Sequence, residues 1–250
     1  MELEIKCPVC SGPSNPLDVV DFNKSCEELR SLYIPLSGIP IYYYLCSVCH
    51  FCFAPEFQHW SLTDFEEKIY NNDYTIFDPD YLNIRPTNNA EVLVEIFDEQ
   101  KAQIKHLDYG GGNGLLSRLL RAKGWDSSSY DPFVNEGMNL NDLGKFNLIT
   151  AFEVFEHVPN ISLLMANLLS LINNNGIILF STLLSNDKII QNKRITWWYA
   201  SPRNGHISLY SVSSLQHLAK QSGFNFLSLS DGLHAFWNTI PLWANHLINL

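Results

Sequence analysis

Hydrophobic residues follow two different spacings in the second half of the chain. Short apolar runs at 104–109, 146–152 and 177–182 are bounded by turn residues, which predicts buried strands. Apolar residues recur at helical spacing in 115–123 and 161–172. The same criteria predict further helices at 90–103 and 213–221 and further strands at 127–131, 224–229 and 233–237. Strands separated by helices predict a mostly parallel sheet with helices on both faces.

The first third of the chain lacks this alternation. Residues 42–44 are typical of a strand, whereas residues 61–86 are rich in Tyr, Asn and Asp and contain the helix breakers Pro79 and Pro86. We therefore predict three parts, which are a small module over 1–60, a connector over 61–87 and an α/β domain over 88–250.

Composition and charge limit the possible functions. Of 250 residues, 46% are hydrophobic, which is enough for a packed core and excludes a disordered chain. The formal net charge is −10, and residues 1–100 carry 17 acidic against 5 basic side chains. Such an acidic segment is unsuited to phosphates, so we expect no nucleic acid partner. The start MELEIKCPVC has no secretory pattern and no apolar run is long enough to span a membrane, so we expect a cytoplasmic location and no membrane partner.

All six cysteines lie within the first 52 residues. Cys7 and Cys10 form one CxxC pair, and Cys46 and Cys49 form another. Two such turns can direct four thiolates at one ion, so we predict a tetrahedral zinc site. An ion with four protein ligands has no open position, so this zinc should be structural. A neighbouring cysteine or histidine could replace one ligand, and the alternative of ordinary core cysteines stays open.

A glycine-rich loop joins a predicted strand to a predicted helix, where backbone can approach a ligand closely. Asp108 precedes the first glycine, and a second acid, Asp131, ends the next strand. The first could meet an ammonium group and would repel a pyrophosphate, and the second could accept hydrogen bonds from ribose hydroxyls. This favours S-adenosylmethionine (SAM) over a nicotinamide dinucleotide. The loop pattern consists of Asp108, Gly110, Gly112 and Gly114.

Several segments occur in the order found in one enzyme family. They are DYGGGNG, YDP with Asp131, FNLITAFEVFEHV and GIILFSTLL. Over about residues 88–240 the chain resembles the class I SAM-dependent methyltransferases. The resemblance implies a Rossmann-like, doubly wound sheet of seven strands, mostly parallel with the last strand antiparallel. The N-terminal metal module is similar to those of certain sugar C-methyltransferases and of some ribosomal RNA guanine methyltransferases.

The resemblance also implies which residues bind SAM. Besides the glycine loop and Asp131, it assigns cofactor contacts to Phe152 and Glu153 after the fourth strand. Arg85, just before the α/β domain, could meet the carboxylate of SAM.

One departure from the family pattern concerns the third strand. Only 14 residues separate Asp131 from Phe146, where the family usually has a helix, a strand and another helix. We therefore expect the third strand to be short or missing. Asn141 or Asp142 is the candidate for the adenine contact.

Candidates for the acceptor side follow the fourth and fifth strands. Glu153 could contact SAM or the acceptor, although a carboxylate there could also interact with a helix dipole. His206 is the candidate general base and Tyr199 a second catalytic candidate, although a histidine in a turn can also bond only to backbone. We interpret Glu156 and His157 as structural.

Segment 188–203 contains four cations, no acid and several aromatic residues, which suits an anionic acceptor. We therefore predict methyl transfer from SAM to a small molecule, with a sugar or a nucleotide-linked sugar as the candidate. The alternatives are an RNA methyltransferase and a SAM-binding protein without turnover. The acidic metal module argues against the first, and the complete glycine loop argues against the second. The sequence leaves the acceptor atom and the oligomeric state open.

Overall fold

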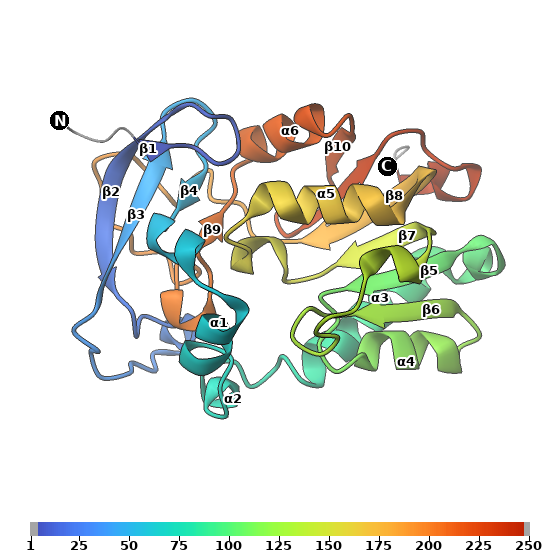
Figure 1. Cartoon of the computed structure of the whole chain (residues 1–250), viewed down its shortest axis with the longest axis horizontal. Helices are drawn as coiled ribbons and strands as arrows, with labels where there is room; N and C mark the ends of the chain where they lie inside the picture. Colours follow the sequence, from blue (N-terminus) through green and yellow to red (C-terminus); the bar gives the residue numbers. More distant parts are fainter. Residues whose placement is uncertain (1–4, 248–250) are drawn as a thin grey trace. The chain divides into compact units, whose positions relative to one another are not determined.

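The computed structural model describes residues 5–247, which form two compact units (Figure 1). Unit 1 combines the N-terminal segment up to Pro79 with residues 155–162 and 182–218. Unit 2 contains residues 80–154, 163–181 and the segment from 219 onward. Each unit is thus completed by segments that are distant in sequence. The three-part division at residues 60 and 87 stays a prediction.

Unit 2 contains a six-stranded sheet built from β5 (Lys105–Tyr109), β6 (Asp126–Tyr130), β7 (Phe146–Ala151), β8 (Ile172–Ser181), β10 (Asn225–Ser228) and β11 (Leu233–Trp237). The strand order is β10-β11-β8-β7-β5-β6. Strands β5 to β8 are parallel, whereas β11 runs antiparallel to both of its neighbours. This mostly parallel sheet with an antiparallel strand confirms the fold class expected from the sequence.

Helices cover both faces of this sheet. On one face lie α3 (Ile84–Phe97) and α4 (Leu115–Ala122), and on the other lies α5 (Ile161–Leu171), drawn in front of β7 and β8 in Figure 1. The Asn167 amide on α5 donates a hydrogen bond to the Tyr109 hydroxyl at 3.1 Å. Side chains of the first face form one core that includes Leu93, Phe97, Leu116, Leu120, Leu148 and Leu179.

The third strand of the family pattern is missing from the described residues. The segment before β7 forms only a single turn, η4 (Leu140–Leu143), so the sheet has six strands instead of the seven that the resemblance implied. The reason is length, because the chain between β6 and β7 is too short for a helix, a strand and a second helix.

The segment expected as an irregular connector is largely helical. It contains α1 (Leu62–Lys68) and α2 (Tyr74–Phe77), and α3 begins at Ile84 instead of near residue 90. Pro86 does not break α3 because it lies in the first turn, where a missing N–H group breaks no helical hydrogen bond.

Unit 1 contains a five-stranded antiparallel sheet, in the order β1 (Ile5–Lys6), β2 (Pro13–Asp21), β3 (Pro40–Cys46), β4 (Cys52–Phe53) and β9 (Ser208–Leu209). The strand predicted at 42–44 lies within β3. The last strand comes from far along the chain, since Cys52 pairs with Leu209. Next to this pairing the rings of Phe51 and Tyr210 pack with centroids 5.0 Å apart. The N-terminal sheet is therefore completed by residues beyond 200.

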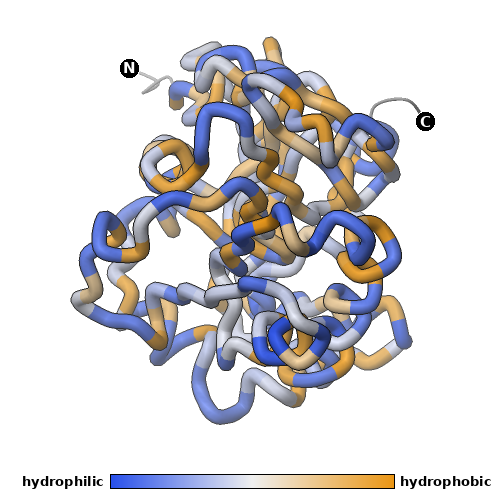
Figure 2. The backbone as a smooth tube through the Cα atoms, turned by 90° about the vertical axis from the view of Figure 1, so that its right-hand side faces the viewer, coloured by the Kyte–Doolittle hydropathy of each residue, from blue (hydrophilic) through white to orange (hydrophobic). Residues whose placement is uncertain are grey.

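Short helical segments connect these elements, namely η1 (Cys26–Arg30), η2 (Pro55–His59), η3 (Asp98–Gln103), η5 (Phe155–His157), η6 (Pro202–Asn204), η7 (Leu242–Leu247) and the longer α6 (Val212–Gln221). Figure 2 shows hydrophobic and hydrophilic stretches alternating along the chain, as packed elements joined by polar loops require. None of the helices within residues 5–247 is long and apolar enough to cross a membrane.

Candidate functional site

The loop between β5 and α4 passes repeatedly through left-handed backbone conformations. Gly110, Gly112 and Gly114 have φ angles of 76°, 52° and 71°, in the region that favours glycine. The N–H groups of Gly110 and Gly111 both donate to the carbonyl of Tyr130, at 2.7 and 3.1 Å. These hydrogen bonds tie the loop to the end of the neighbouring strand β6.

Gly111 is a site residue that the spacing pattern did not reveal. A Cβ at this position would overlap the Asp108 carboxylate and the Ser129 hydroxyl, and a Cβ at Gly110 would overlap Val154. A Cβ at Gly112 would meet no atom within 4 Å, so this position faces open space. The loop therefore forms a backbone cradle with one open face. The uninterrupted run of three glycines was the signal for Gly111.

Asp131 immediately follows β6 and holds the open part of this cradle. Its Oδ2 accepts a hydrogen bond from the N–H of Gly112 at 2.9 Å, and its Oδ1 accepts one from the N–H of Phe133 at 2.9 Å. The structure thus brings the second predicted acid to the glycine loop. Its contact with ribose hydroxyls stays a prediction.

Asp108 lies at the base of the loop with only 4% of its surface exposed. Thr150 donates to its Oδ1 at 3.1 Å, and His106 bridges Thr150 and Ser127 at 2.9 and 2.8 Å. Burial raises the pKa of Asp108 to about 7 and lowers the pKa of His106 to about 3, so this imidazole is neutral. An ionised carboxylate so far from water is stabilised by a nearby cation. A cationic group therefore suits this cradle, whereas a phosphate does not.

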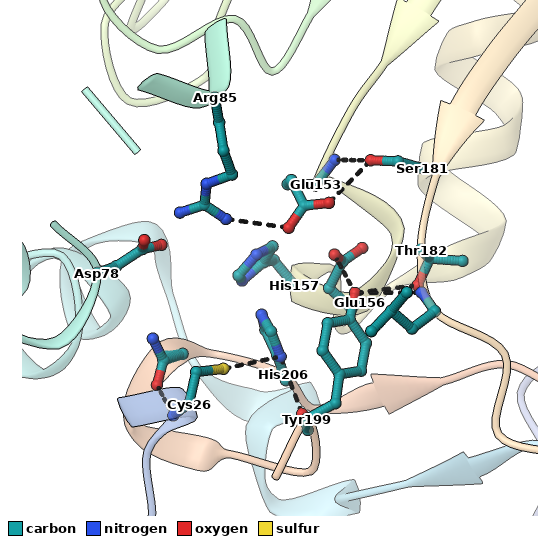
Figure 3. Close-up of polar contacts among 12 residues, drawn as sticks. Cys26, Asp78, Arg85, Glu153, Glu156, His157, Ser181, Thr182, Tyr199 and His206 are labelled. Carbon is teal, nitrogen blue, oxygen red and sulfur yellow. Dashed lines mark hydrogen bonds and ion pairs between the residues drawn. The ribbon is translucent and has the colours of Figure 1, made fainter. Parts of the chain in front are cut away.

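Glu153 follows β7 with a φ of 54°, a conformation that costs a residue other than glycine about 1–2 kcal/mol. Its N–H donates to the Ser181 hydroxyl at 2.8 Å, and that hydroxyl donates to Oε1 at 2.9 Å (Figure 3). Arg85 donates to Oε2 at 3.0 Å. Arg85, expected to meet the carboxylate of SAM, is thus paired with Glu153, next to the buried Phe152. A residue with a strained backbone and hydrogen bonds to both of its carboxylate oxygens is typical of a functional position.

A second polar cluster lies within unit 1 around His206, which is 4% exposed. Its Nδ1 lies 2.9 Å from the carbonyl oxygen of Tyr199, and its own carbonyl accepts a hydrogen bond from the Tyr43 hydroxyl at 2.7 Å. A neutral imidazole donates through Nδ1 in this arrangement, which makes Nε2 its basic nitrogen. The structure therefore brings the predicted pair His206 and Tyr199 together, with ring centroids 4.2 Å apart.

Two residues interpreted as structural belong to the same cluster. Glu156 is fully buried and its Oε1 accepts a hydrogen bond from the Tyr199 hydroxyl. The His157 ring lies 4.8 Å from the His206 ring, and its Nδ1 lies 3.1 Å from the Tyr70 hydroxyl. One ligand atom from each of Glu156, His157 and His206 lies within 4.8 Å of the others. No local pattern in the sequence places His206 beside the other two.

Residues 188–203 form the basic and aromatic segment, and its last cation, Arg203, points into the interior of unit 1. The Arg203 guanidinium lies 3.8 Å over the Phe77 ring and is 6% exposed. Arg194 donates to Asp18 at 2.9 Å. Arg203 is therefore used for packing within unit 1, where it is not available to a phosphate.

The four predicted zinc ligands converge within unit 1. The Sγ atoms of Cys7 and Cys49 lie 3.6 Å apart, those of Cys10 and Cys46 lie 3.5 Å apart, and all four lie within 4.8 Å of one another. Sulfur atoms at about 2.3 Å from a tetrahedral zinc ion would be about 3.8 Å apart. The hydrogen bond between the two thiols lowers the pKa of Cys7 and raises the pKa of Cys49. The four thiols therefore fit a structural zinc ion.

Comparison with known proteins finds similarity to methyltransferases. A protein-family model described as a methyltransferase domain matches residues 81–229. The ubiquinone biosynthesis O-methyltransferase of Colwellia psychrerythraea is 24% identical over 163 residues, which cover 63% of this chain and 64% of that protein. Among solved structures, human N-acetylserotonin methyltransferase in complex with SAM matches 71% of this chain and 58% of its own, with 13% identity and a TM-score of 0.49. Streptomyces venezuelae DesVI matches 69% and 98%, with 13% identity and a TM-score of 0.43.

Proposed function

Because the chain belongs to the methyltransferase-domain family, we propose that it transfers the methyl group of SAM to a hydroxyl oxygen of a small molecule. The observation that carries this proposal is the loop after β5, where the buried Asp108 and the neighbouring Asp131 flank a backbone cradle with an open face. Two acids beside such a cradle suit a ligand that combines positive charge with ribose hydroxyls.

The residues of unit 2 would hold the cofactor and exclude water. SAM supplies an electrophilic methyl group on a sulfonium. The N–H groups at the start of α4 would bind its carboxylate, Asp108 would balance its positive charge and Asp131 would accept hydrogen bonds from its ribose. Phe152 and the ion pair of Glu153 with Arg85 would line the carboxyl end of β7, where parallel sheets bind their ligands.

A hydroxyl acceptor must lose its proton during the transfer, so the acceptor side needs a group that promotes this loss. We assign that task to the cluster of His206, Tyr199 and Glu156. The Tyr199 carbonyl engages Nδ1 of His206 and so directs the basic character to Nε2. The similarity to an O-methyltransferase of ubiquinone biosynthesis supports oxygen as the acceptor atom.

A sugar or a nucleotide-linked sugar is the narrower acceptor that the sequence suggested. The burial of Arg203 against Phe77 gives no support to an anionic acceptor, so we propose a neutral hydroxylated molecule first. The four cysteines would hold a structural zinc ion, and the reducing cytoplasm that we predict for this protein would keep their thiols available.

Two measurements on the full chain test this function. Titration calorimetry with SAM should give saturable binding that Asp131→Ala weakens and Asp126→Ala, an exposed acid of the same strand, leaves unchanged. A radiolabelled methyl group should then appear in at least one member of a panel of phenols and neutral sugars. Absence of SAM binding, or label found only in RNA or on nitrogen, would refute the proposal.

A further inference from the structure

The side chains of Glu156, His157 and His206 have the donor atoms to bind a metal ion as well as to accept a proton. One ligand atom from each residue lies within 4.8 Å of the other two, and all three residues belong to unit 1. Neighbouring ligands of an octahedral ion at about 2.1 Å are about 3 Å apart, so small side-chain adjustments would bring these atoms around one ion. Two imidazoles and one carboxylate are a ligand set that transition metals use.

Each of these residues also has the kind of outer partner that orients metal ligands. The Tyr199 carbonyl engages Nδ1 of His206 at 2.9 Å, and the Tyr70 hydroxyl engages Nδ1 of His157 at 3.1 Å. The Tyr199 hydroxyl donates to Oε1 of Glu156. Such contacts fix the ring orientation and select Nε2 as the ligand nitrogen. Figure 3 shows the two imidazole rings next to one another, with Glu156 beside His157.

We propose that Glu156, His157 and His206 bind one divalent transition-metal ion through a carboxylate oxygen and two Nε2 atoms. Imidazole ligands favour zinc, cobalt or iron over magnesium, calcium and manganese, which prefer oxygen ligands. Three protein ligands leave coordination positions open for water or an acceptor hydroxyl. The site differs in this respect from the closed tetracysteine site.

What the ion does rests on the proposed function. A hydroxyl bound to the ion has a lowered pKa and loses its proton to solvent. Its oxygen then forms a bond to the methyl carbon while the methyl–sulfur bond breaks and its electron pair stays on sulfur. His206 is then a metal ligand, and the ion takes over the promotion of proton loss.

Metal content of the full chain tests the site directly. Zinc-saturated protein should contain one equivalent for the cysteines and a second for this site. His157→Asn should lose only the second equivalent, and this half-buried position disturbs the core less than the buried His206. The exposed His59 of unit 1 gives the matched control, since His59→Ala should keep both. A single equivalent in the unaltered chain, or both retained in His157→Asn, would overturn the proposal.

Cobalt(II) provides a second readout because thiolate ligands give an intense charge-transfer absorption that nitrogen and oxygen ligands lack. After dialysis against a chelator has emptied the open site and left zinc on the cysteines, added cobalt should produce weak ligand-field bands without the thiolate band. Tyr199→Phe keeps all three ligands but removes the outer partner of Glu156, so it should weaken cobalt binding about 10- to 100-fold. A thiolate band alone, or cobalt affinity unchanged in Tyr199→Phe and in His157→Asn, would contradict the assignment.

These readouts are independent of methyl transfer. Cobalt binding that His157→Asn abolishes, without transfer to any hydroxyl, would refute the proposed function and leave the metal site standing. Full methyl transfer by chelator-treated protein would keep the proposed function and overturn the role of the ion.

Discussion

The Arg85 guanidinium donates a hydrogen bond to Oε2 of Glu153 at 3.0 Å, next to the end of the central strand β7. The two side chains are 30% and 32% exposed, and ion pairs of such exposure contribute only about 0–1 kcal/mol to stability. The pair therefore matters mainly for orientation. It holds the carboxylate of a residue whose own backbone is strained, with φ at 54°.

Replacement of Glu153 should separate activity from stability. Glu153→Gly removes the backbone strain together with the side-chain contacts, so the free energy of unfolding should change by less than about 1 kcal/mol. Methyl transfer should nevertheless fall at least about tenfold, or about 1.4 kcal/mol in transition-state stabilisation. Urea unfolding and initial rates measure the two effects. Glu153→Ala is the control, because it keeps the strain, loses the same contacts and should be less stable. An unchanged rate in Glu153→Gly would make this residue purely structural.

Gly111 should be intolerant of any side chain. A methyl group there would overlap the Asp108 carboxylate and the Ser129 hydroxyl, so Gly111→Ala should displace the loop and raise the Kd for SAM at least about tenfold. Titration calorimetry measures this change. Gly124→Ala introduces a side chain at a φ of 85° with no neighbour within 4 Å, so it should reduce stability by about 1 kcal/mol and leave the Kd unchanged. Equal Kd values for the two variants would show that the cradle is not the SAM site.

The buried carboxyl of Asp108 should make both stability and SAM binding depend on pH. Burial raises its pKa to about 7, above the usual value of about 4. Between these values the folded chain retains a proton that the unfolded chain has lost, so this contribution to stability is full below about pH 4. It decreases as the pH rises, by up to about 1.4 kcal/mol per unit, and levels off above about pH 7. Urea unfolding at several pH values should show this slope, and Asp108→Asn should remove it.

SAM binding should follow the opposite trend, because a positive ligand favours the ionised carboxylate. The affinity of the unaltered chain should increase between about pH 6 and about pH 8. In Asp108→Asn this increase should disappear, whereas any pH dependence caused by titration of SAM itself would remain. An equally steep increase in the variant would assign the dependence to another group.

Loss of one zinc ligand should unfold unit 1. Binding of structural zinc is worth about 10–16 kcal/mol in zinc-finger peptides, comparable to the total stability of a domain. Cys46→Ser should therefore lose the tetracysteine zinc and the far-ultraviolet signal of unit 1. Cys52→Ser gives the comparison, since Cys52 is equally buried but lies outside the four, and it should keep zinc. Zinc retained at full occupancy by Cys46→Ser would contradict the predicted ligand set.

Much of unit 2 could be predicted because its elements are specified locally. The apolar runs that became β5, β7 and β8 are bounded by turn residues, and these runs alternate with helical spacing. The missing third strand followed from the short distance between Asp131 and Phe146. The match to the methyltransferase-domain family confirms the resemblance, which rested on several motifs in a fixed order.

What the sequence did not reveal depends on contacts between distant residues or on backbone geometry. Glu153 has a left-handed conformation, which residue type does not signal outside glycine. His206 meets Glu156 and His157 only because the segment after Thr182 belongs to the same unit as η5. The inward direction of Arg203 depends on Phe77, from a distant part of the chain. Each case requires tertiary packing, on which local periodicity is silent.

The pairing of Cys52 with Leu209 has a consequence for the order of events on the ribosome. The nascent chain exposes both CxxC pairs early. The strand β9, which is the second partner of β4, emerges about 150 residues later. At about 5–20 residues per second this delay is roughly 8–30 seconds. During that time the strand edge at Phe53 has no intramolecular partner and is open to pairing with other chains. A growing polypeptide of this sequence therefore completes its N-terminal sheet only after translation has passed residue 209.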